Sequence, residues 1–424
     1  MSVPEQMIGV EEALSFILSH FEPLEPETVY ILDALGRVLA EAILSDVAIP
    51  PFDNSSMDGY AVRAADTAGA SPEMPVTLRV VADVPAGTVA DTPVGLGKAA
   101  RIMTGAPLPE GADAVVPVEE TDKWTNTSQA PRGKGATVEV FKAAKVGANV
   151  RQAGRDMQPG ELVLTTGTLV RPAEIAVLAT LGHSRVQVIR RPRVAVLATG
   201  DELLDIDEPL SPGKIRNSNE YSNAALVARY GAIPVRLGIA HDTVADLTAK
   251  IHEGLAQSVD LFVTSAGVSV GDYDVVKDVL KAEGEIRFWK VKMKPGKPLA
   301  FGTIQGVPLL GLPGNPTSSM VSFEQFARPA ILKMQGRTKL TKPTVEAILD
   351  DPLRRTDRRG YQRVIVCQDE NGVYHAGTAG LQVSGYISAM ARANGLAIVP
   401  EGEGTLPPGT QVTVQMLDWP EVEK

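Results

Sequence analysis

Three apolar runs between residues 261 and 320 are each followed by a polar turn: LFVTSAGVSVGDYDVVKDVL (261–280), FWKVKMKPGKPLAFG (288–302) and PLLGLPGNPTSSM (308–320). Short apolar strands that end in polar loops are typical of an open α/β sheet. Ligands of such sheets bind in the loops at the carboxyl ends of the strands. This stretch therefore predicts an α/β domain with its functional site at the strand ends.

The polar turns of this stretch combine acids, lysines and small polar residues. They carry Asp272, Asp274, Lys290, Lys292, Lys294, Lys297, Asn315, Ser318 and Ser319. Carboxylates hold divalent cations, whereas lysines, hydroxyls and free backbone N–H groups hold oxyanions. The combination suits a multiply anionic ligand that is handled with a divalent metal. Any one of these turns alone also fits an ordinary polar loop.

Strand and helix patterns alternate throughout residues 188–338. VAVLAT is a wholly apolar, β-branched run, as a buried parallel strand should be. SNEYSNAALVARYGA is a helix pattern with Ser218 or Asn219 as its cap, and Asp242 is placed to cap the next helix. The alternation predicts a central three-layer α/β domain with a mostly parallel sheet, covered on both faces.

The flanking segments have short strand patterns separated by turn residues, which makes the chain a multidomain α/β protein with β-rich additions. The expected organisation is an N-terminal helix (1–26), a linker domain (27–52 and 148–187), an inserted β-rich domain (53–147), the α/β domain (188–338) and a C-terminal, β-barrel-like domain (339–424).

Composition excludes several classes of function. The 424 residues fit two to four domains at roughly 100–200 residues each. A net charge of -10 without a long basic run argues against nucleic acid as a partner. No apolar run approaches the ~18 residues of a membrane span, and the start lacks a signal-peptide pattern, so no membrane partner is expected.

Cys367 is the only cysteine of the chain. It excludes an intrachain disulfide and a multi-cysteine metal site, and it fits a reducing, cytoplasmic compartment. Its apolar surroundings, RVIVCQ, predict a buried structural thiol. The five histidines are scattered, so no zinc site is predicted.

Several further motifs have two interpretations. Asp201 and Glu202 in TGDEL either reach a metal or cap a helix and begin its first turn. TSAGVSVG, which contains Gly267 and Ser269, is a Gly/Ser turn whose N–H groups suit a phosphate or pterin oxygen, but it lacks the lysine of a P-loop. On composition alone, the turns that contain Asp58, Thr104, Arg151 and Asp156 are ordinary solvated turns.

Taken in order, six motifs resemble one family. SSMDGYAVRAAD, RIMTGAPLPEGADAVVPVEE, ATGDEL, SAGVSVGDYD, KPGKPLAFG and GLPGNPTSS follow the order found in the molybdopterin molybdenumtransferases, the family of bacterial MoeA proteins and the E domain of gephyrin. The resemblance spans about residues 9–415. It implies insertion of molybdenum from molybdate into adenylylated molybdopterin with release of AMP, supported by a divalent cation such as Mg²⁺.

The resemblance also implies an assembly. Family members form elongated homodimers of four domains per subunit, and the active cleft is shared between subunits. The N-terminal helix packs with the α/β domain. A molybdopterin adenylyltransferase is an expected partner, because it supplies the adenylylated substrate.

Carried over residue by residue, the family pattern assigns roles along the whole chain. Asp274, Asp242 and Glu202 match functional acids that hold Mg²⁺, and Lys290 and Lys294 match lysines near the terminal phosphate. Lys294, Lys297 and Ser318 match one proposed molybdate pocket, and Arg363 and Ser384 match a second. Asp58, Thr104, Arg151 and Asp156 match residues that reach the cleft across the dimer, and Gly267 and Ser269 belong to the ligand-binding turn.

The chain departs from the family pattern at a few positions. Ala266 stands where the family commonly has Gly, and Arg155 replaces an acid before Asp156. Gly385 and Tyr386 replace the usual Ser and basic residue beside Ser384. Two alternatives to the transferase are a non-catalytic pterin-binding or scaffold protein and the related adenylyltransferase, although the β-rich flanks argue against the latter.

Overall fold

The computed structural model describes residues 7–122, 135–266 and 284–419. The chain divides into two compact units: unit 1 comprises residues 1–40, 167–175 and 185–424, and unit 2 comprises residues 41–166 and 176–184. Within the described ranges, no helix combines the length and apolar character that a bilayer crossing requires.

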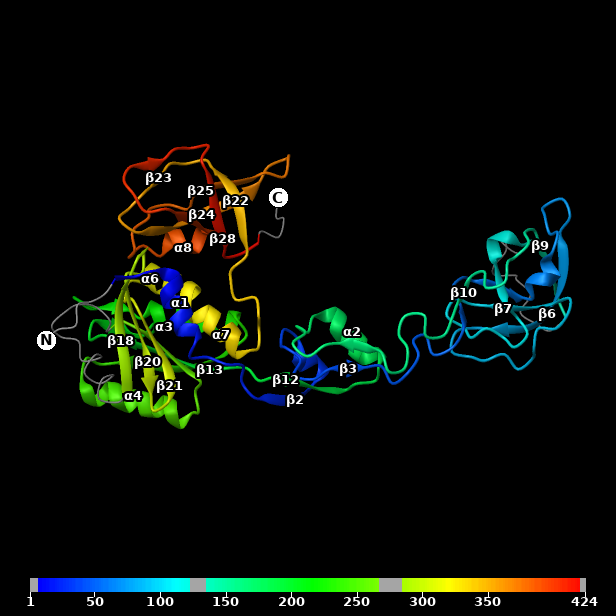
Figure 1. Ribbon diagram of the computed structural model, residues 1–424, viewed down its shortest axis with the longest axis horizontal. Helices are drawn as coiled ribbons and strands as arrows, with labels where there is room; N and C mark the ends of the chain where they lie inside the picture. The colour runs from blue at the N-terminus through cyan, green and yellow to red at the C-terminus, as the bar shows by residue number, and fades with distance from the viewer. Residues whose placement is uncertain (1–6, 123–134, 267–283, 420–424) are drawn as a thin grey trace. The chain divides into compact units, whose positions relative to one another are not determined.

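A seven-stranded sheet forms the centre of unit 1 (Figure 1). Its strands, in spatial order, are β1 (Met7–Ile8), β18 (Gly284–Val291), β20 (Pro298–Ile304), β21 (Val307–Leu312), β17 (Leu261–Ser265), β13 (Arg193–Thr199) and β16 (Ile233–Ala240). β20 is antiparallel to both of its neighbours, and the other four pairings are parallel. The predicted α/β class is confirmed. The edge strand β1 was not predicted, because two residues carry no periodic pattern.

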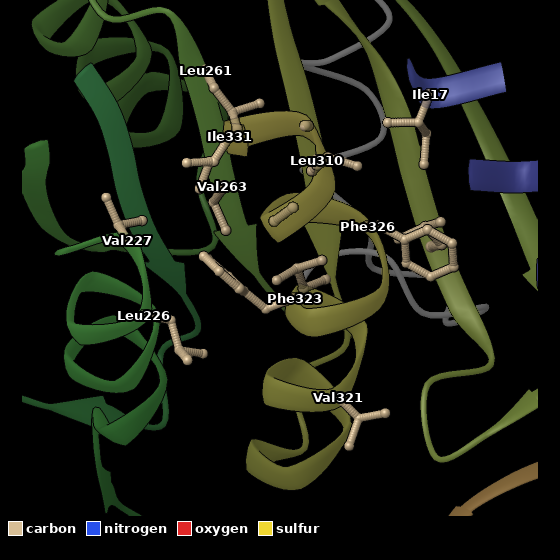
Figure 2. Packing of buried hydrophobic residues seen from close by; sticks show 14 of the residues in the cluster. Ile17, Leu226, Val227, Leu261, Val263, Leu310, Val321, Phe323, Phe326 and Ile331 are labelled. Carbon is tan, nitrogen blue, oxygen red and sulfur yellow. The ribbon is translucent and has the colours of Figure 1, made fainter. Parts of the chain in front are cut away.

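Helices cover both faces of this sheet. α1 (Val10–Leu18), α3 (Ser218–Arg229), α6 (Pro316–Ser322), the π-helical segment η5 (Phe323–Ala327) and α7 (Arg328–Met334) pack into one apolar core with the sheet, and α4 (Val244–Ala256) packs into the other. Figure 2 shows Phe323 and Phe326 of η5 in the first core, which also contains Val263 and Leu310 of the sheet. Burial of these rings fixes the rotation of η5.

Two predicted helix caps are wrong by one or two positions. Asn217, not Ser218 or Asn219, caps α3, since its side chain accepts the Glu220 N–H at 3.2 Å. Thr243, not Asp242, caps α4 by accepting the Asp246 N–H at 3.2 Å. Neighbouring polar residues compete for a cap, and the chain path entering the helix selects the one whose side chain reaches the free N–H.

The C-terminal part of unit 1 is a β structure closed on itself, here called the C-terminal barrel. Its strands are β24 (Arg359–Gln368), β25 (Tyr374–Thr378), β22 (Thr344–Leu349), β28 (Gln411–Met416) and β26 (Gly395–Val399), and β26 pairs back with β24. β19 (Met293–Lys294) pairs in parallel with β24, and β23 (Leu353–Arg354) with β27 (Thr405–Leu406), while α8 is Ser388–Arg392. Cys367 is exposed on β24, so its predicted burial is wrong. Alternation along the strand turns its side chain outward.

Smaller elements complete unit 1. β2 (Pro26–Tyr30) pairs with β12 (Arg185–Ile189), and β14 (Leu203–Leu204) with β15 (Ile215–Arg216). The 3₁₀ turn η1 is Ile31–Ala34, and α2 (Pro172–Thr180) spans the boundary between the units.

Unit 2 contains the β-rich domain. Its five-stranded sheet has the order β8 (Ala114–Pro117), β5 (Gly59–Val62), β7 (Lys98–Ile102), β6 (Val76–Val84) and β9 (Thr137–Val140). The pairs β4 (Asn54–Ser55) with β10 (Val150–Arg151) and β3 (Ile43–Leu44) with β11 (Leu162–Leu164), and the 3₁₀ turns η2 (Ala64–Thr67) and η3 (Val118–Glu120), are also present.

Candidate active site

A cleft of about 1100 Å³ in unit 1 lies between the carboxyl ends of the sheet strands and the C-terminal barrel. Its lining includes six of the predicted site residues: Glu202, Lys294, Lys297, Ser318, Arg363 and Ser384. It also carries Arg216, Arg354 and Arg358, so that among the described lining residues six cationic side chains face one carboxylate, that of Glu202. The described lining thus has a local charge of +5 in a chain of net charge -10, which suits an anionic ligand.

The lysine turn is held in the cleft by two different domains. Lys294 ends β19, which pairs with β24 of the C-terminal barrel, with Lys294 opposite Gly360. Lys297 is half-buried just before β20 of the α/β sheet. Gly296 between them has φ +105°, and a β-carbon there would lie 2.6 Å from Ser322 Oγ. Only glycine fits this turn without displacing its neighbours.

Arg363 is buried in the barrel wall of the cleft. Its Nη2 donates hydrogen bonds to the carbonyl oxygens of Leu381 and Val383 at 3.1 and 3.3 Å, whereas its buried Nε has no partner among the described residues. Burial lowers the pKa of the guanidinium to about 10, so it stays protonated at neutral pH. An unpaired buried cation beside a cleft is an arrangement that an anion completes.

The loop that carries Ser384 is tied to helix α6. Thr317, fully buried next to Ser318, donates from its N–H to the Ser384 carbonyl oxygen and from Oγ1 to the Tyr386 carbonyl oxygen, both at 3.2 Å. Ser318 and Ser384 therefore line the same cleft although they come from the α/β domain and the barrel. The replaced neighbours Gly385 and Tyr386 are exposed.

Three polar atoms on the sheet side of the cleft are buried and have no partner among the described residues: Thr199 Oγ1, Asn219 Oδ1 and Ser265 Oγ. Buried polar atoms are normally hydrogen-bonded. They are candidate ligand contacts that the sequence reading missed. The sequence signal that could have identified them is their position at the ends of the strand patterns (β13 and β17) and in the first turn of the helix pattern (α3).

The predicted acids are only partly brought together. The Glu202 carboxylate is exposed and packs over Gly200, where an added β-carbon would lie 2.3 Å from Oε2. Asp242 lies outside the described lining and interacts with Asp201 instead: the Asp242 N–H donates to Asp201 Oδ1 at 3.3 Å, and His241 Nδ1 lies 3.1 Å from the same oxygen. These contacts lower the pKa of Asp201, chiefly through the Asp242 N–H.

No group of three metal-binding side chains occurs among the residues that the structure describes. Asp272, Asp274, Gly267 and Ser269 lie outside the described residues. Lys290 on β18 and the exposed Lys292 lie outside the described lining of the cleft.

The other predicted site residues belong to unit 2. Asp58 Oδ1 accepts hydrogen bonds from the Thr104 N–H at 2.7 Å and from its hydroxyl at 2.8 Å, and these bonds lower the pKa of Asp58. Arg151 on β10 pairs with Asn54 on β4, and the Asp156 N–H donates to the Ile49 carbonyl oxygen. All four site residues are exposed, and no hydrogen bond or ion pair joins the Arg151 or Asp156 side chain to the Asp58–Thr104 pair in the described part of unit 2.

Three family models match the chain in succession. The MoeA N-terminal region (domains I and II) matches residues 8–182, a "probable molybdopterin binding domain" matches residues 195–333, and the MoeA C-terminal region (domain IV) matches residues 346–417. The second match contains the sheet side of the cleft, and the third contains Arg363 and Ser384.

Curated relatives match over nearly the full length. Molybdopterin molybdenumtransferase 2 of Mycobacterium tuberculosis is 38% identical over 96% of this chain and 99% of its own length. The molybdopterin molybdenumtransferases of Nostoc and Bacillus subtilis are 39% and 37% identical over 93% and 97% of this chain, covering 89% and 96% of their own lengths.

Solved structures agree. The molybdopterin biosynthesis MoeA protein from Pyrococcus horikoshii is 32% identical, with a TM-score of 0.79 over 98% of this chain and all of the Pyrococcus chain. Fold, order of domains and sequence thus point to one group. This chain belongs to the molybdopterin molybdenumtransferase family.

Proposed function

We propose that this chain inserts molybdenum from molybdate into adenylylated molybdopterin and releases AMP, the last step of molybdenum cofactor biosynthesis. The observation that carries the proposal is the cleft, whose described lining sets six cations against the carboxylate of Glu202. Relatives of full length at 37–39% identity are named for this activity. Both substrates are anions, so one cationic cleft serves both.

The proposed roles follow from the lining. Lys294, Lys297, Ser318 and Arg363 bind molybdate and the pyrophosphate oxygens through charge-assisted hydrogen bonds. Ser384 supplies a further donor from the barrel. Fixed cations stabilise the charge that develops when the phosphoanhydride is cleaved, because they need no reorganisation during the reaction. The lysines and Arg363 act by position and charge, so the chemistry requires no protein nucleophile.

A divalent cation, Mg²⁺, is part of the proposal. Oxygen ligands suit it, and Glu202 offers an exposed carboxylate at the cleft with no side-chain partner among the described residues. Glu202, Asp242 and Asp274 are the residues proposed to hold it. The described donors fit such a site only in part, since Asp242 is engaged with Asp201. When bound, Mg²⁺ would neutralise pyrophosphate oxygens.

We further propose a cytoplasmic homodimer that receives its substrate from a molybdopterin adenylyltransferase. The exposed Asp58–Thr104 pair supports a binding role for unit 2. Two hydrogen bonds fix the orientation of the Asp58 carboxylate, although this side chain is exposed and contributes to no apolar core. Arg151, Asp156, Gly267 and Ser269 are included as ligand-binding residues, and Lys290 as a catalytic lysine. The domain limits remain those expected from the sequence.

Lys297→Gln tests the proposal against a matched control, Lys292→Gln. Both changes remove one lysine of the same turn region, but only Lys297 lines the cleft. Turnover of adenylyl-molybdopterin with molybdate should fall at least about tenfold in Lys297→Gln, as expected when a charged contact is lost, and stay unchanged in Lys292→Gln. A wild-type chain that binds the substrate without releasing AMP would instead be a pterin-binding or scaffold protein. Equal turnover of the two variants would remove Lys297 from the mechanism.

A further inference from the structure

The C-terminal barrel is attached to the α/β domain by a buried polar cluster, here called the hinge cluster: Tyr230, Glu324, Arg328 and Lys342. Glu324 and Arg328 lie on η5 and the start of α7, Tyr230 follows α3, and Lys342 lies in the segment before β22. The side chains of Glu324 and Lys342 are 3% and 5% exposed. None of the four lines the cleft.

The Glu324 carboxylate is contacted by two donors of the cluster, Tyr230 and Lys342. Tyr230 Oη lies 2.8 Å from both carboxylate oxygens, and Lys342 Nζ lies 3.0 Å from Oε2. Burial, followed by the Glu324 charge, raises the pKa of Tyr230, so its hydroxyl remains a donor. The guanidinium of Arg328 lies over the Tyr230 ring, 5.2 Å from its centre.

The hinge cluster and the neighbouring Gln325 contact the last strand of the barrel, β28, through one hydrogen bond to the main chain and one between side chains. Lys342 Nζ donates to the Met416 carbonyl oxygen at 3.3 Å, and Gln325, the neighbour of Glu324, donates to Gln415 Oε1 at 2.8 Å. Both acceptors lie on β28. β28 pairs with β26, and β26 pairs with β24, where Leu396 stands opposite Arg363. Glu324 is therefore linked through two strand pairings to the barrel wall of the cleft.

The helix that carries Glu324 also reaches the other wall. α6, η5 and α7 follow one another without a break from Pro316 to Met334, and Ser318 in the first turn lines the cleft. Phe323 and Phe326 anchor η5 in the apolar core (Figure 2). The continuous helical segment Pro316–Met334 thus carries Ser318 in its first turn and contacts the barrel through η5 in its middle. A π-helical segment changes which side chains face outward, and such segments are frequent at functional sites.

Apolar contact also joins the two parts, since Tyr361 and Leu396 of the barrel belong to the same core as Phe326. Apolar contact is non-directional and tolerates small displacements. A buried ion pair needs a defined geometry, because a displaced partner leaves a desolvated charge. The hinge cluster therefore adds a buried ion pair to the other directional links between the two parts, which include the β19–β24 pairing, the Thr317–Ser384 hydrogen bond and the exposed Arg229–Asp418 pair.

We propose that Glu324 is a positioning residue: with Tyr230 and Lys342 it fixes where the C-terminal barrel sits on the α/β domain, and so sets the spacing between Arg363 and the Lys294–Lys297 turn across the cleft. The proposed consequence for catalysis rests on the function proposed above. The consequence for the barrel position does not, and it is measured separately.

The barrel position is measured first, without any substrate. Cys367 is the only cysteine, lies exposed on the barrel and takes one spin label, and Ala256→Cys on the exposed end of α4 takes the other. Pulsed electron resonance gives the distribution of distances between the labels. We expect Glu324→Gln to broaden or shift this distribution, and Glu346→Gln, which removes an exposed carboxylate of the barrel, to leave it unchanged. An unchanged distribution in Glu324→Gln would overturn the proposal.

The second measurement is molybdate binding by calorimetry, combined with urea unfolding. Glu324→Gln should weaken binding about five- to twentyfold, because displacements near 1 Å cost that much or more. The double variant Glu324→Gln/Lys342→Met removes the unpaired ammonium as well. It should recover stability but not molybdate affinity, since the buried Glu324–Lys342 pair then no longer defines the geometry.

A merely structural Glu324 gives a different pattern, in which stability and affinity recover together in the double variant; that result would refute the positioning role. If Glu324→Gln does not fold, the double variant and Tyr230→Phe decide, through the label distances. Absence of molybdate binding in the wild-type chain would contradict the proposed function, while the label distances would still judge the position of the barrel.

Discussion

Arg363, a residue that is 1% exposed, donates a hydrogen bond from its guanidinium to the carbonyl oxygen of Val383 at 3.3 Å. A main-chain oxygen is a poor substitute for a carboxylate, and burial depresses the pKa of this arginine accordingly. The protein thus keeps a charged group in an environment that disfavours it. Such an arrangement is explained by a ligand that supplies the missing negative charge.

Replacement of this arginine should separate stability from binding. We expect Arg363→Met to change the free energy of unfolding by less than about 1 kcal/mol, because removal of a buried charge offsets the two lost hydrogen bonds. Molybdate affinity should fall at least about tenfold, the equivalent of one charged contact. Urea unfolding and calorimetry give the two quantities, and Arg355→Met, outside the described lining, is the control. A variant that loses stability but still binds molybdate would show that Arg363 is structural.

Gly296 should be irreplaceable in the lysine turn. A methyl group at φ +105° would be strained, and it would lie 2.6 Å from Ser322 Oγ. Gly296→Ala should lower the free energy of unfolding by about 1–3 kcal/mol and weaken molybdate binding through displacement of Lys297. Ser322→Ala in the same chain should restore only part of the loss, because it relieves the contact and not the backbone strain. If the double variant regained the full free energy of unfolding, the positive φ at residue 296 would impose no backbone strain on alanine.

Replacement of Ala266 by glycine, the residue that the family commonly has at this position, should stabilise the protein. The φ of Ala266 is +74°, a conformation that costs a residue with a β-carbon about 1–2 kcal/mol. Ala266→Gly removes this strain but adds freedom to the unfolded chain, so the free energy of unfolding should rise by up to about 1 kcal/mol. Thermal and urea unfolding measure the change. A loss of stability would contradict the left-handed conformation at this position.

Glu174 should make stability depend on pH in the acid range. Hydrogen bonds from the Arg171 side chain, and then from its N–H, lower the pKa of Glu174 to about 2 from 4.5. A lowered pKa means that the stabilisation is complete above pH 4.5 and is lost as the pH falls toward 2. Because Arg171 is largely exposed, we expect Glu174→Gln to lose no more than about 1 kcal/mol at pH 7.

Urea unfolding of both proteins from pH 7 to pH 2 checks the prediction for Glu174. The difference between wild type and Glu174→Gln should be constant at neutral pH and vanish near the lower limit. A difference that persists at pH 2 would show that the carboxylate charge is not its source.

Local pattern was sufficient for the longer buried strands of the described part of the α/β domain. Apolar runs such as VAVLAT and VPLLGLP are buried strands because a sheet covered on both faces needs apolar residues at every position. Local pattern was less reliable where several neighbouring residues could cap a helix or where a side chain could face either side of a strand. Asn217 and Thr243 replaced the predicted caps, and Cys367 faces outward, since half of the residues of a barrel strand do so.

The sequence by itself determined the α/β class and predicted the order of the domains, the strand-end location of the candidate site and its cationic character, because periodicity and turn chemistry are local properties of the chain. Only the tertiary structure decided which of these residues meet. It joined Lys294 to the barrel through β19, placed Ser384 against the helix of Ser318, turned Asp242 toward Asp201 and buried Glu324 beside Lys342. Such pairings depend on register and burial between segments far apart in the chain, which no local pattern specifies.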